Sequence, residues 1–183
     1  ADGGAVAAAA GSAAKGQGEP VFDRQDFWKH SLAVGCAAKL LAQHLGPKID
    51  PEEAFVCGLL HDLGKVALDA ILPKSYSRVI DIARTERAAI SDVENRLLGV
   101  DHTVVGKRLG QRWGLPESIV STIWLHHQDP DMLPRAVPGQ EYARLVYLAD
   151  LVVREHRSGF SGNWIFAHSA RGRAGRMRRR RNA

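Results

Sequence analysis

The adjacent pair His61-Asp62 is the feature of this sequence with the clearest chemical potential. It ends the apolar run Cys57-Gly58-Leu59-Leu60 and is followed at once by Leu63, Gly64 and Lys65. Burying an imidazole and a carboxylate side by side costs free energy unless something satisfies both groups. A divalent metal ion does so, because it binds a neutral ring nitrogen and a carboxylate oxygen together. A hydrogen-bonded structural pair is the alternative, so the interpretation depends on further ligands elsewhere.

Further candidate ligands are spread over about 120 residues of the chain. Asp150 interrupts the apolar run from Leu145 to Val153, and aspartate is seldom fully buried without a partner. Any one of these residues alone is more often a core or cap residue than a ligand. Occurring together they favour a metal site, and His44, His156 and His168 are expected at the surface. The seven candidates are His30, His61, Asp62, His102, His126, His127 and Asp150.

Length and composition indicate one soluble domain in a reducing compartment. The chain has 183 residues, and no apolar run approaches the length of a membrane span. No secretory signal is recognisable, and Cys36 and Cys57 form no CxxC pair. We expect both cysteines to pack as small apolar side chains in a cytoplasmic protein.

The net charge of +5 depends on the C-terminal end. Seven arginines and no acid occur in the last thirteen residues, and the rest of the chain carries 18 basic against 20 acidic residues. The body therefore lacks the charge of a nucleic-acid-binding protein, and only the Arg-rich end weakly suggests nucleic acid as a partner. We expect a disordered Ala/Gly-rich segment over 1–19, a helical domain over 20–157 and a disordered Arg-rich tail over 158–183.

Helix start and stop signals predict an all-α, compact helical bundle. Phe27, His30, Val34, Ala37 and Leu41 lie three and four residues apart, which predicts one buried face. The segments 50–53 and 91–94 are expected to form capping boxes. Gly64 is expected to break or bend a helix. The expected helices are 24–45, 51–61, 66–72, 74–88, 92–98, 102–113, 117–127 and 141–156.

These elements position the candidate ligands in two ways. His61-Asp62 and His126-His127 end helices, and His102 begins one, with Asp101 as its cap. His30 and Asp150 lie on inward helical faces. Helix ends and faces that converge on one cavity can hold a rigid ligand set.

The order and context of these motifs resemble the HD superfamily of metal-dependent phosphohydrolases, and within it the HDOD family, a signalling output domain. The resemblance covers about residues 22–155. It rests on Phe27-Trp28-Lys29-His30, Gly58-Leu59-Leu60-His61-Asp62-Leu63-Gly64-Lys65, Glu94 with Leu98-Gly99-Val100-Asp101-His102, Trp113-Gly114-Leu115-Pro116, and His126-His127.

The resemblance implies a set of ligand roles. The positions of His30, His61, Asp62 and Asp150 would hold one metal ion, and those of His102, His126 and His127 would help hold a second. Asp62 would bridge the two ions, and a phosphohydrolase would use it catalytically. Lys65 could contact a phosphate or be an ordinary solvated lysine. Mixed nitrogen and oxygen ligation without cysteine suits one or two ions of Fe, Mn, Zn, Ni or Co.

Two departures from related families bear on function. HDOD domains ordinarily begin with a further helical half, where this chain has residues 1–19. The Gly-Tyr-Pro motif of related cyclic-di-GMP phosphodiesterases is replaced by 128–134, so that substrate is not transferred. We therefore expect a regulatory signal-transduction domain with a retained metal site. The alternative is a phosphodiesterase or phosphatase acting on a nucleotide or another phosphoester. The expected partners are signalling proteins or a phosphorylated small molecule, and no membrane.

Overall fold

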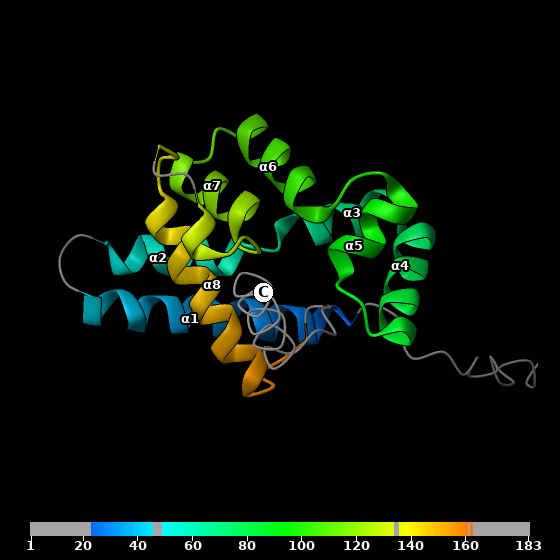
Figure 1. Cartoon of the computed structure of the whole chain (residues 1–183), viewed down its shortest axis with the longest axis horizontal. Coiled ribbons are helices and arrows are strands. Elements are labelled where there is room, and N and C mark those ends of the chain that lie inside the picture. The colour runs from blue at the N-terminus through cyan, green and yellow to red at the C-terminus, as the bar shows by residue number, and fades with distance from the viewer. Residues whose placement is uncertain (1–22, 46–48, 134–135, 161, 163–183) are drawn as a thin grey trace, which may run out of the picture.

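The protein is helical throughout the part that its structure, a computed structural model, describes: residues 23–45, 49–133, 136–160 and 162. No β-strand occurs in these residues, which confirms the all-α prediction (Figure 1). The elements are α1 (Arg24–Leu45), α2 (Pro51–Leu60), α3 (Leu63–Ile71), α4 (Pro73–Glu86), α5 (Ile90–Leu98), α6 (His102–Arg112), α7 (Glu117–Leu125), the 3-10 helix η1 (Pro130–Met132) and α8 (Gln140–Glu155).

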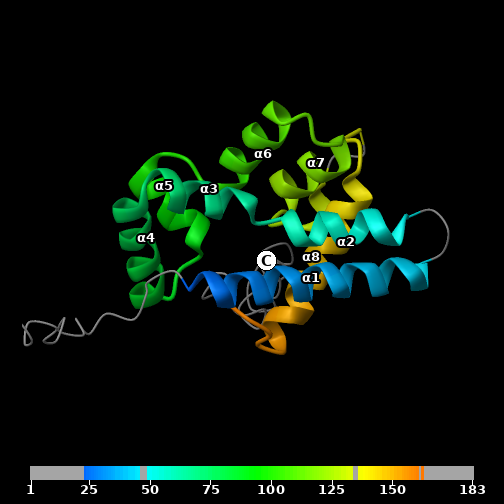
Figure 2. The same cartoon turned by 180° about the vertical axis from the view of Figure 1, so that it is seen from behind.

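The main core lies between α1, α2, α7 and α8. α1 and α2 run antiparallel and side by side, and α8 crosses them (Figures 1 and 2). Two glycines let the first pair of helices approach closely: a Cβ on Gly58 would lie 2.8 Å from the Cα of Gly35. Buried apolar side chains such as Val34, Ile123 and Val146 fill the space between the four helices.

A second close approach joins α3 to α6. A Cβ on Gly64 would overlap the backbone carbonyl of His102, and it would lie 2.9 Å from the nitrogen of Gly106. The predicted helix break at Gly64 is wrong, because Gly64 lies inside α3 and the chain turns at His61-Asp62 instead. This glycine is needed for helix packing, which places the His61-Asp62 turn beside the start of α6.

The helices α4 and α5 form a smaller core at one end of the molecule (Figure 1). Tyr76, Val79, Ile90 and Val93 are fully or almost fully buried there. α3 packs on α4, and α5 contacts α6. This end of the molecule therefore adjoins the first turn of α6, where His102 lies.

Two helix caps are as predicted, and neither capping box forms. The side chains of Asp50 and Asp101 accept hydrogen bonds from the first backbone amides of α2 and α6. Glu53 instead accepts hydrogen bonds from the hydroxyls of Ser118 and Tyr142. α5 begins at Ile90, so the 91–94 box is wrong as well, and its glutamate turns inward. Glu53 and Glu94 thus accept hydrogen bonds from residues of other helices, and not from the backbone amide of their own N-cap residue as in a capping box.

Burial along α1 differs in part from the expected face. Phe27, His30 and Val34 are buried, but the buried stripe continues through Ala38 and Ala42. Ala37 and Leu41 are only partly covered, because the neighbours of α1 lie slightly to one side of the face that the spacing indicated.

Cys57 is buried as expected, whereas the prediction for Cys36 is wrong, because it lies on the exposed side of α1. His44 and His156 are exposed as predicted. His168 lies outside the described residues, as do the segment 1–19 and most of the Arg-rich tail. Among the helices that the structure describes, none is long and apolar enough to cross a membrane.

Candidate metal centre

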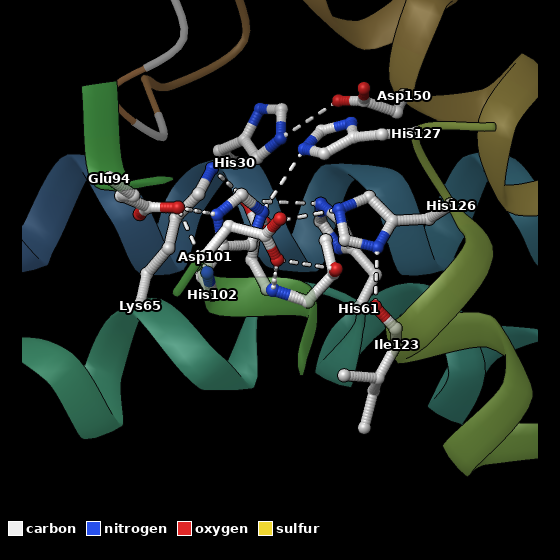
Figure 3. A network of polar contacts seen from close by, with 12 residues as sticks. His30, His61, Lys65, Glu94, Asp101, His102, Ile123, His126, His127 and Asp150 are labelled. Atoms are coloured by element: carbon white, nitrogen blue, oxygen red, sulfur yellow. Dashed lines mark hydrogen bonds and ion pairs between the residues drawn. The ribbon is translucent and has the colours of Figure 1, made fainter. Parts of the chain in front are cut away.

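All seven candidate ligands meet in one largely buried cluster, and Figure 3 labels all of them except Asp62. Three of the segments that carry them are helix ends: the turn between α2 and α3, the first residue of α6 and the turn after α7. The other two ligands, His30 and Asp150, project from the interiors of α1 and α8. The cluster divides into two groups whose potential ligand atoms lie within 4.8 Å of one another: Asp62, His102, His126 and His127, and His30, His61 and Asp150.

The four-residue group surrounds one carboxylate oxygen. The Oδ1 of Asp62 lies 3.4 Å from His102 Nε2 and 3.3 Å from His126 Nε2. The Nε2 of His127 lies 3.1 Å from that of His102. Asp62, His102 and His126 are buried and His127 is partly exposed. One oxygen and three ring nitrogens therefore face a common point.

The ring orientations are fixed by acceptors on the far nitrogen. His61 Nδ1 lies 2.7 Å from the carbonyl oxygen of Gly58, and His126 Nδ1 lies 2.9 Å from that of Ile123. A carbonyl only accepts, so each Nδ1 carries the proton and each Nε2 presents its lone pair to the cluster. This is the tautomer that metal-ligating histidines adopt.

Glu94, on α5, fixes the orientation of the His102 ring in the same way, as an acceptor at Nδ1. Its Oε2 lies 2.6 Å from His102 Nδ1 and also accepts the backbone N–H of His102 at 2.9 Å, while the hydroxyl of Tyr76 donates to Oε1. Glu94 is fully buried. From the sequence, Glu94 is expected only to be part of a family motif and of a helix cap. Its position eight residues before His102, on the buried side of α5, was the signal that it could face that histidine.

The three-residue group is held differently. His30 Nε2 lies 3.1 Å from Asp150 Oδ1, and the Oδ2 of Asp150 lies 3.0 Å from the guanidinium of Arg154. His30 is fully buried, and neither of its ring nitrogens makes a hydrogen bond within the described residues. The ring of His61 lies 5.6 Å from that of His30, centroid to centroid, and connects this group to Asp62.

Lys65 is not a solvated lysine. It is fully buried, and its Nζ donates to the Oδ2 of Asp62 at 2.8 Å. It lies one turn after Asp62 on α3, so the helix brings the ammonium back onto the carboxylate. The interpretation of Lys65 as a surface residue is therefore wrong, and its expected contact with a phosphate stays a prediction.

The pKa shifts of Asp62, His126 and His127 suit a metal site. Burial lowers the pKa of His126 to about 4 and also lowers that of His127, which keeps both rings neutral near pH 7. Burial alone would raise the pKa of Asp62, but Lys65 and His61 hold it well below its ordinary value. Burial disfavours the charged form of His61, but the Asp62 and Asp150 carboxylates raise its pKa, so an ion that binds His61 has to displace a proton. Neutral rings and ionised carboxylates are the forms that bind divalent cations.

Four buried polar atoms of the candidate ligands make no hydrogen bond within the described residues: Asp62 Oδ1, His126 Nε2, and Nδ1 and Nε2 of His30. Buried polar atoms are nearly always satisfied, so each requires an explanation. A divalent cation is a chemically suitable one, because Asp62 Oδ1 and one ring nitrogen of each of the two histidines can donate a lone pair. The residues present thus fit a metal ion, and their role as ligands stays a prediction.

A family model described as the HDOD domain matches residues 5–129. The chain belongs to the HDOD family. The match ends before Asp150, so that residue is tied to the site by geometry and not by the family match. The HDOD match also begins ahead of residue 22, where the recognisable motifs start.

Solved structures resemble this HDOD chain over about three quarters of its length. An HDOD domain protein of unknown function from Geobacter sulfurreducens is 34% identical, with a TM-score of 0.70 over 76% of this chain and 45% of that one. The MmoQ response regulator from Methylococcus capsulatus is 28% identical, with a TM-score of 0.60 over 73% of this chain and 51% of that one. A protein named as a proposed phosphohydrolase, from Shewanella amazonensis, is 30% identical, with a TM-score of 0.62 over 74% and 48%.

Two relatives with curated descriptions match this chain over a smaller share of their own length than the solved structures do. An uncharacterized protein of Treponema pallidum is 30% identical over 108 residues, which are 59% of this chain and 21% of that protein. Ribonuclease Y of Thermus thermophilus is 31% identical over 126 residues, 69% of this chain and 16% of the enzyme. The HDOD chain thus spans about a fifth or less of these relatives and about half of the solved ones.

Proposed function

We propose that this HDOD chain is a regulatory, signal-transducing domain that binds a divalent metal ion at the cluster around Asp62. The observation that carries the proposal is the arrangement at Asp62 Oδ1, an unsatisfied buried oxygen faced by the Nε2 atoms of His102 and His126. The bound ion would supply fixed positive charge and a Lewis acid. The chain's own residues orient the ligands, through Glu94 and the carbonyl of Ile123.

Burial favours a regulatory role over turnover. Six of the seven candidate ligands are buried, and only His127 is partly exposed. An ion held there can order the junction of α3, α6 and α7 without contacting a substrate. The name of the MmoQ relative, a response regulator, supports the same role. A partner signalling protein or a phosphorylated small molecule is the corresponding input.

A metal-dependent phosphohydrolase is the second candidate. The names of the Shewanella phosphohydrolase and of ribonuclease Y favour it. In that case the exposed edge at His127 would admit a phosphoester, and the ion would supply an activated water. Asp62 would hold the ion, and Lys65 would fix the other oxygen of Asp62. Fe, Mn, Zn, Ni and Co all suit this ligand set.

Two further proposals concern the surroundings of the domain. A cytoplasmic location fits two cysteines that form no disulfide with each other, Cys36 and Cys57. Nucleic acid is a weaker proposal, supported only by the seven arginines near the C-terminus. Loss of nucleic-acid binding on truncation after Ala170 would assign it to that segment.

One experiment tests the proposed function and separates its two versions. The protein is purified without chelator, its metal content is measured by mass spectrometry, and the same sample is assayed with bis(p-nitrophenyl) phosphate and p-nitrophenyl phosphate. Bound metal without turnover of either compound is the expected result for a regulatory domain. Turnover that is lost in Asp62→Asn would establish the phosphohydrolase instead. Protein that binds none of the five metals would refute both versions.

A further inference from the structure

A cavity of about 440 Å³ lies between α6, α7 and the segment that leads into α8. This α6–α7 groove is lined by residues between 107 and 124 and by 136–138. Its volume is within the ordinary range of small-molecule sites, about 300–1,000 Å³. None of the described residues that line it is one of the seven candidate ligands. The groove is therefore a second place at which the molecule can bind a ligand, separate from the metal cluster.

The helices α6 and α7 lie side by side (Figures 1 and 2) and run antiparallel. An added Cβ on Gly106 would lie 2.5 Å from the side chain of Ile123, near the end of α7. An added Cβ on Gly110 would lie 3.2 Å from that of Val120, nearer the start of α7. One end of the groove therefore adjoins the middle of α6 and the end of α7, and the other end adjoins the turn between the two helices.

Charged side chains of opposite sign mark these two ends. The Nζ of Lys107 lies 3.2 Å from the centroid of the Trp124 ring, which places the ammonium at the first end. Gln111 and Glu117 lie at the second end, on either side of the turn. Glu117 precedes Trp124 by seven residues on α7, which is a separation of about 10 Å along the helix. A ligand that reaches both ends must be elongated.

The polar side chains of the groove are available to a ligand. Those of Lys107, Gln111, Glu117 and Ser121 make no ion pair or hydrogen bond within the described residues. Ser121 is almost entirely buried, where polar groups normally have a partner. A ligand in the groove would supply the hydrogen bonds that these groups lack.

The first end of the groove suits an anion. The helix α6 carries three basic residues, Lys107, Arg108 and Arg112, and no acidic residue. None of the three forms an ion pair within the described residues. The ring of Trp124 attracts the Lys107 ammonium without neutralising its charge. A phosphate group is a matching partner, because an ammonium is a compact charge with three hydrogen-bond donors.

The second end suits a flat ring with hydrogen-bond donors on its edge. A carboxylate such as that of Glu117 only accepts hydrogen bonds, whereas the amide of Gln111 both donates and accepts. Leu115, Val120 and Val137 line the groove with apolar surface that can cover the faces of a ring. A heterocyclic base combines such faces with a polar edge.

We infer that the α6–α7 groove binds a nucleoside monophosphate, with its phosphate at Lys107 and the edge of its base at Glu117. Such a molecule carries its anionic group and its base edge at opposite ends. Guanine fits best, because its N1–H and its amino group are adjacent donors that one carboxylate can accept together. The inference rests on the proposed function and deepens it, since it names the phosphorylated small molecule that is the input of the regulatory domain.

The α6–α7 groove and the metal cluster share two helices. His102 is the first residue of α6, and His126 follows the last residue of α7. A nucleotide in the groove therefore contacts both of the helices whose ends present these candidate ligands. The groove is thus suitably placed for an input to the cluster.

The test measures nucleotide binding to the full chain by isothermal titration calorimetry, before and after treatment with chelator. Guanosine monophosphate (GMP) should bind in both states, and guanosine and inorganic phosphate should each bind more weakly. In Lys107→Met the Kd for GMP should rise roughly tenfold or more, as for the loss of one charge-assisted hydrogen bond. The matched control is Lys29→Met, which removes an exposed positive charge of α1 and should leave the Kd unchanged.

A second variant keeps the test decisive should Lys107→Met not fold by circular dichroism. Glu117 is exposed, so Glu117→Gln leaves the core intact. The wild type should prefer GMP to uridine monophosphate, because the single N–H of uracil lies between two oxygens that the carboxylate repels. Glu117→Gln should reduce this preference and leave the binding of inorganic phosphate unchanged. An unaltered preference would overturn the place assigned to the base.

The possible results separate this inference from the proposed function. No GMP binding by the wild type, or equal losses in Lys107→Met and Lys29→Met, would overturn the inference and leave metal binding intact. GMP binding that disappears with the metal and is unaffected by Lys107→Met would place the nucleotide at the cluster, which also overturns it. GMP binding that depends on Lys107, in protein that binds none of the five metals, would refute the proposed function and support the inference.

Discussion

The two ligand groups of this molecule differ in how their side chains are held. In the four-residue group the ligands come from helix ends, and the rings of His102 and His126 are oriented by acceptors on Nδ1. In the three-residue group His30 and Asp150 project from the interiors of long helices, and His30 has no such acceptor within the described residues. The third member of that group, His61, does have an acceptor on Nδ1, the carbonyl oxygen of Gly58, so the difference between the groups lies in His30 and Asp150.

Two glycine contacts set the positions of these groups. Gly64 against the backbone of His102 joins the Asp62 turn to α6, while Gly35 against Gly58 joins α1, which carries His30, to α2. Each contact depends on the absence of a side chain, so a single added methyl group can disturb one group and spare the other. The comparison can therefore be tested by small substitutions.

The largest expected effect is that of Gly64→Ala. Its Cβ would overlap the backbone carbonyl of His102, and backbone cannot move aside as a side chain can. We expect a loss of at least about 3 kcal/mol in the free energy of unfolding, at the upper end of overpacking costs. Urea denaturation measures it. The control is Gly110→Ala, whose Cβ meets the Val120 side chain at 3.2 Å and which should cost much less. Equal stability of the two variants would contradict the packing account.

The next effect concerns the orientation of His102. Glu94→Gln keeps the shape of the side chain but removes the charge that holds His102 Nδ1 at 2.6 Å. We expect the metal affinity to fall by roughly 10–100-fold, as for other partners that orient a ligand. Isothermal titration with Zn²⁺ measures it. The matched control is Glu86→Gln, which alters an exposed ion pair with Arg96. An unchanged affinity in Glu94→Gln would show that the charge of Glu94 does not strengthen metal binding through His102.

Acid should distinguish the two groups in the metal-free protein. The pKa of buried His126 is lowered to about 4, and an unfolded histidine has a pKa near 6.5, so the unfolded state binds the proton first as the pH falls. His126 therefore contributes no pH dependence above 6.5 and costs on the order of 2 kcal/mol of stability at pH 5. The folded pKa of His61 is raised, so His61 gains stability over the same change in pH.

The measurement is the free energy of unfolding at pH 7.5 and pH 5 in chelator-treated protein. His126→Gln should reduce the loss of stability between the two values, and His61→Gln should increase it. The same sign of change in both variants would remove the electrostatic distinction between the groups.

The smallest expected effect is that of Tyr76→Phe. The hydroxyl of Tyr76 donates to Glu94 Oε1 at 3.0 Å, inside the core of α4 and α5. Its loss should cost about 1 kcal/mol of stability, because one buried hydrogen bond is removed, and metal affinity should fall only a few-fold. Thermal unfolding and Zn²⁺ titration measure the two effects. A drop in affinity as large as that of Glu94→Gln would mean that Tyr76 and not Glu94 fixes His102.

Local patterns predicted the helices well, because these depend on caps, spacing and residue type, and the role of the candidate ligands stays a prediction. Asp50 and Asp101 are caps as expected, and all seven candidate ligands lie in one cluster. Long-range relationships were missed. Gly64 has no local signal that its neighbour is His102, and Glu53 and Glu94 look like caps until donors from other helices are in place.

Lys65 shows the same limit at the site itself. A lysine one turn after an aspartate is ordinarily a surface residue, and its burial follows only from the packing of α3 on α6 and α4. Cys36 is the opposite case, because no element of the described structure covers that side of α1. For both residues, burial depends on which other helices pack against their own helix, and the sequence of one helix does not show which helices those are.

Metal content in wild type, Asp62→Ala and His127→Ala tests the central claim most directly. Asp62 is a buried carboxylate and candidate ligand at the centre of the four-residue group, whereas His127 lies at its partly exposed edge. After identical loading and dialysis, we expect stoichiometric metal in the wild type and an intermediate amount in His127→Ala. Asp62→Ala should retain less than about a tenth of the wild-type content. Equal metal content in wild type and Asp62→Ala, with both proteins folded, would contradict the account and leave His61-Asp62 as a structural pair.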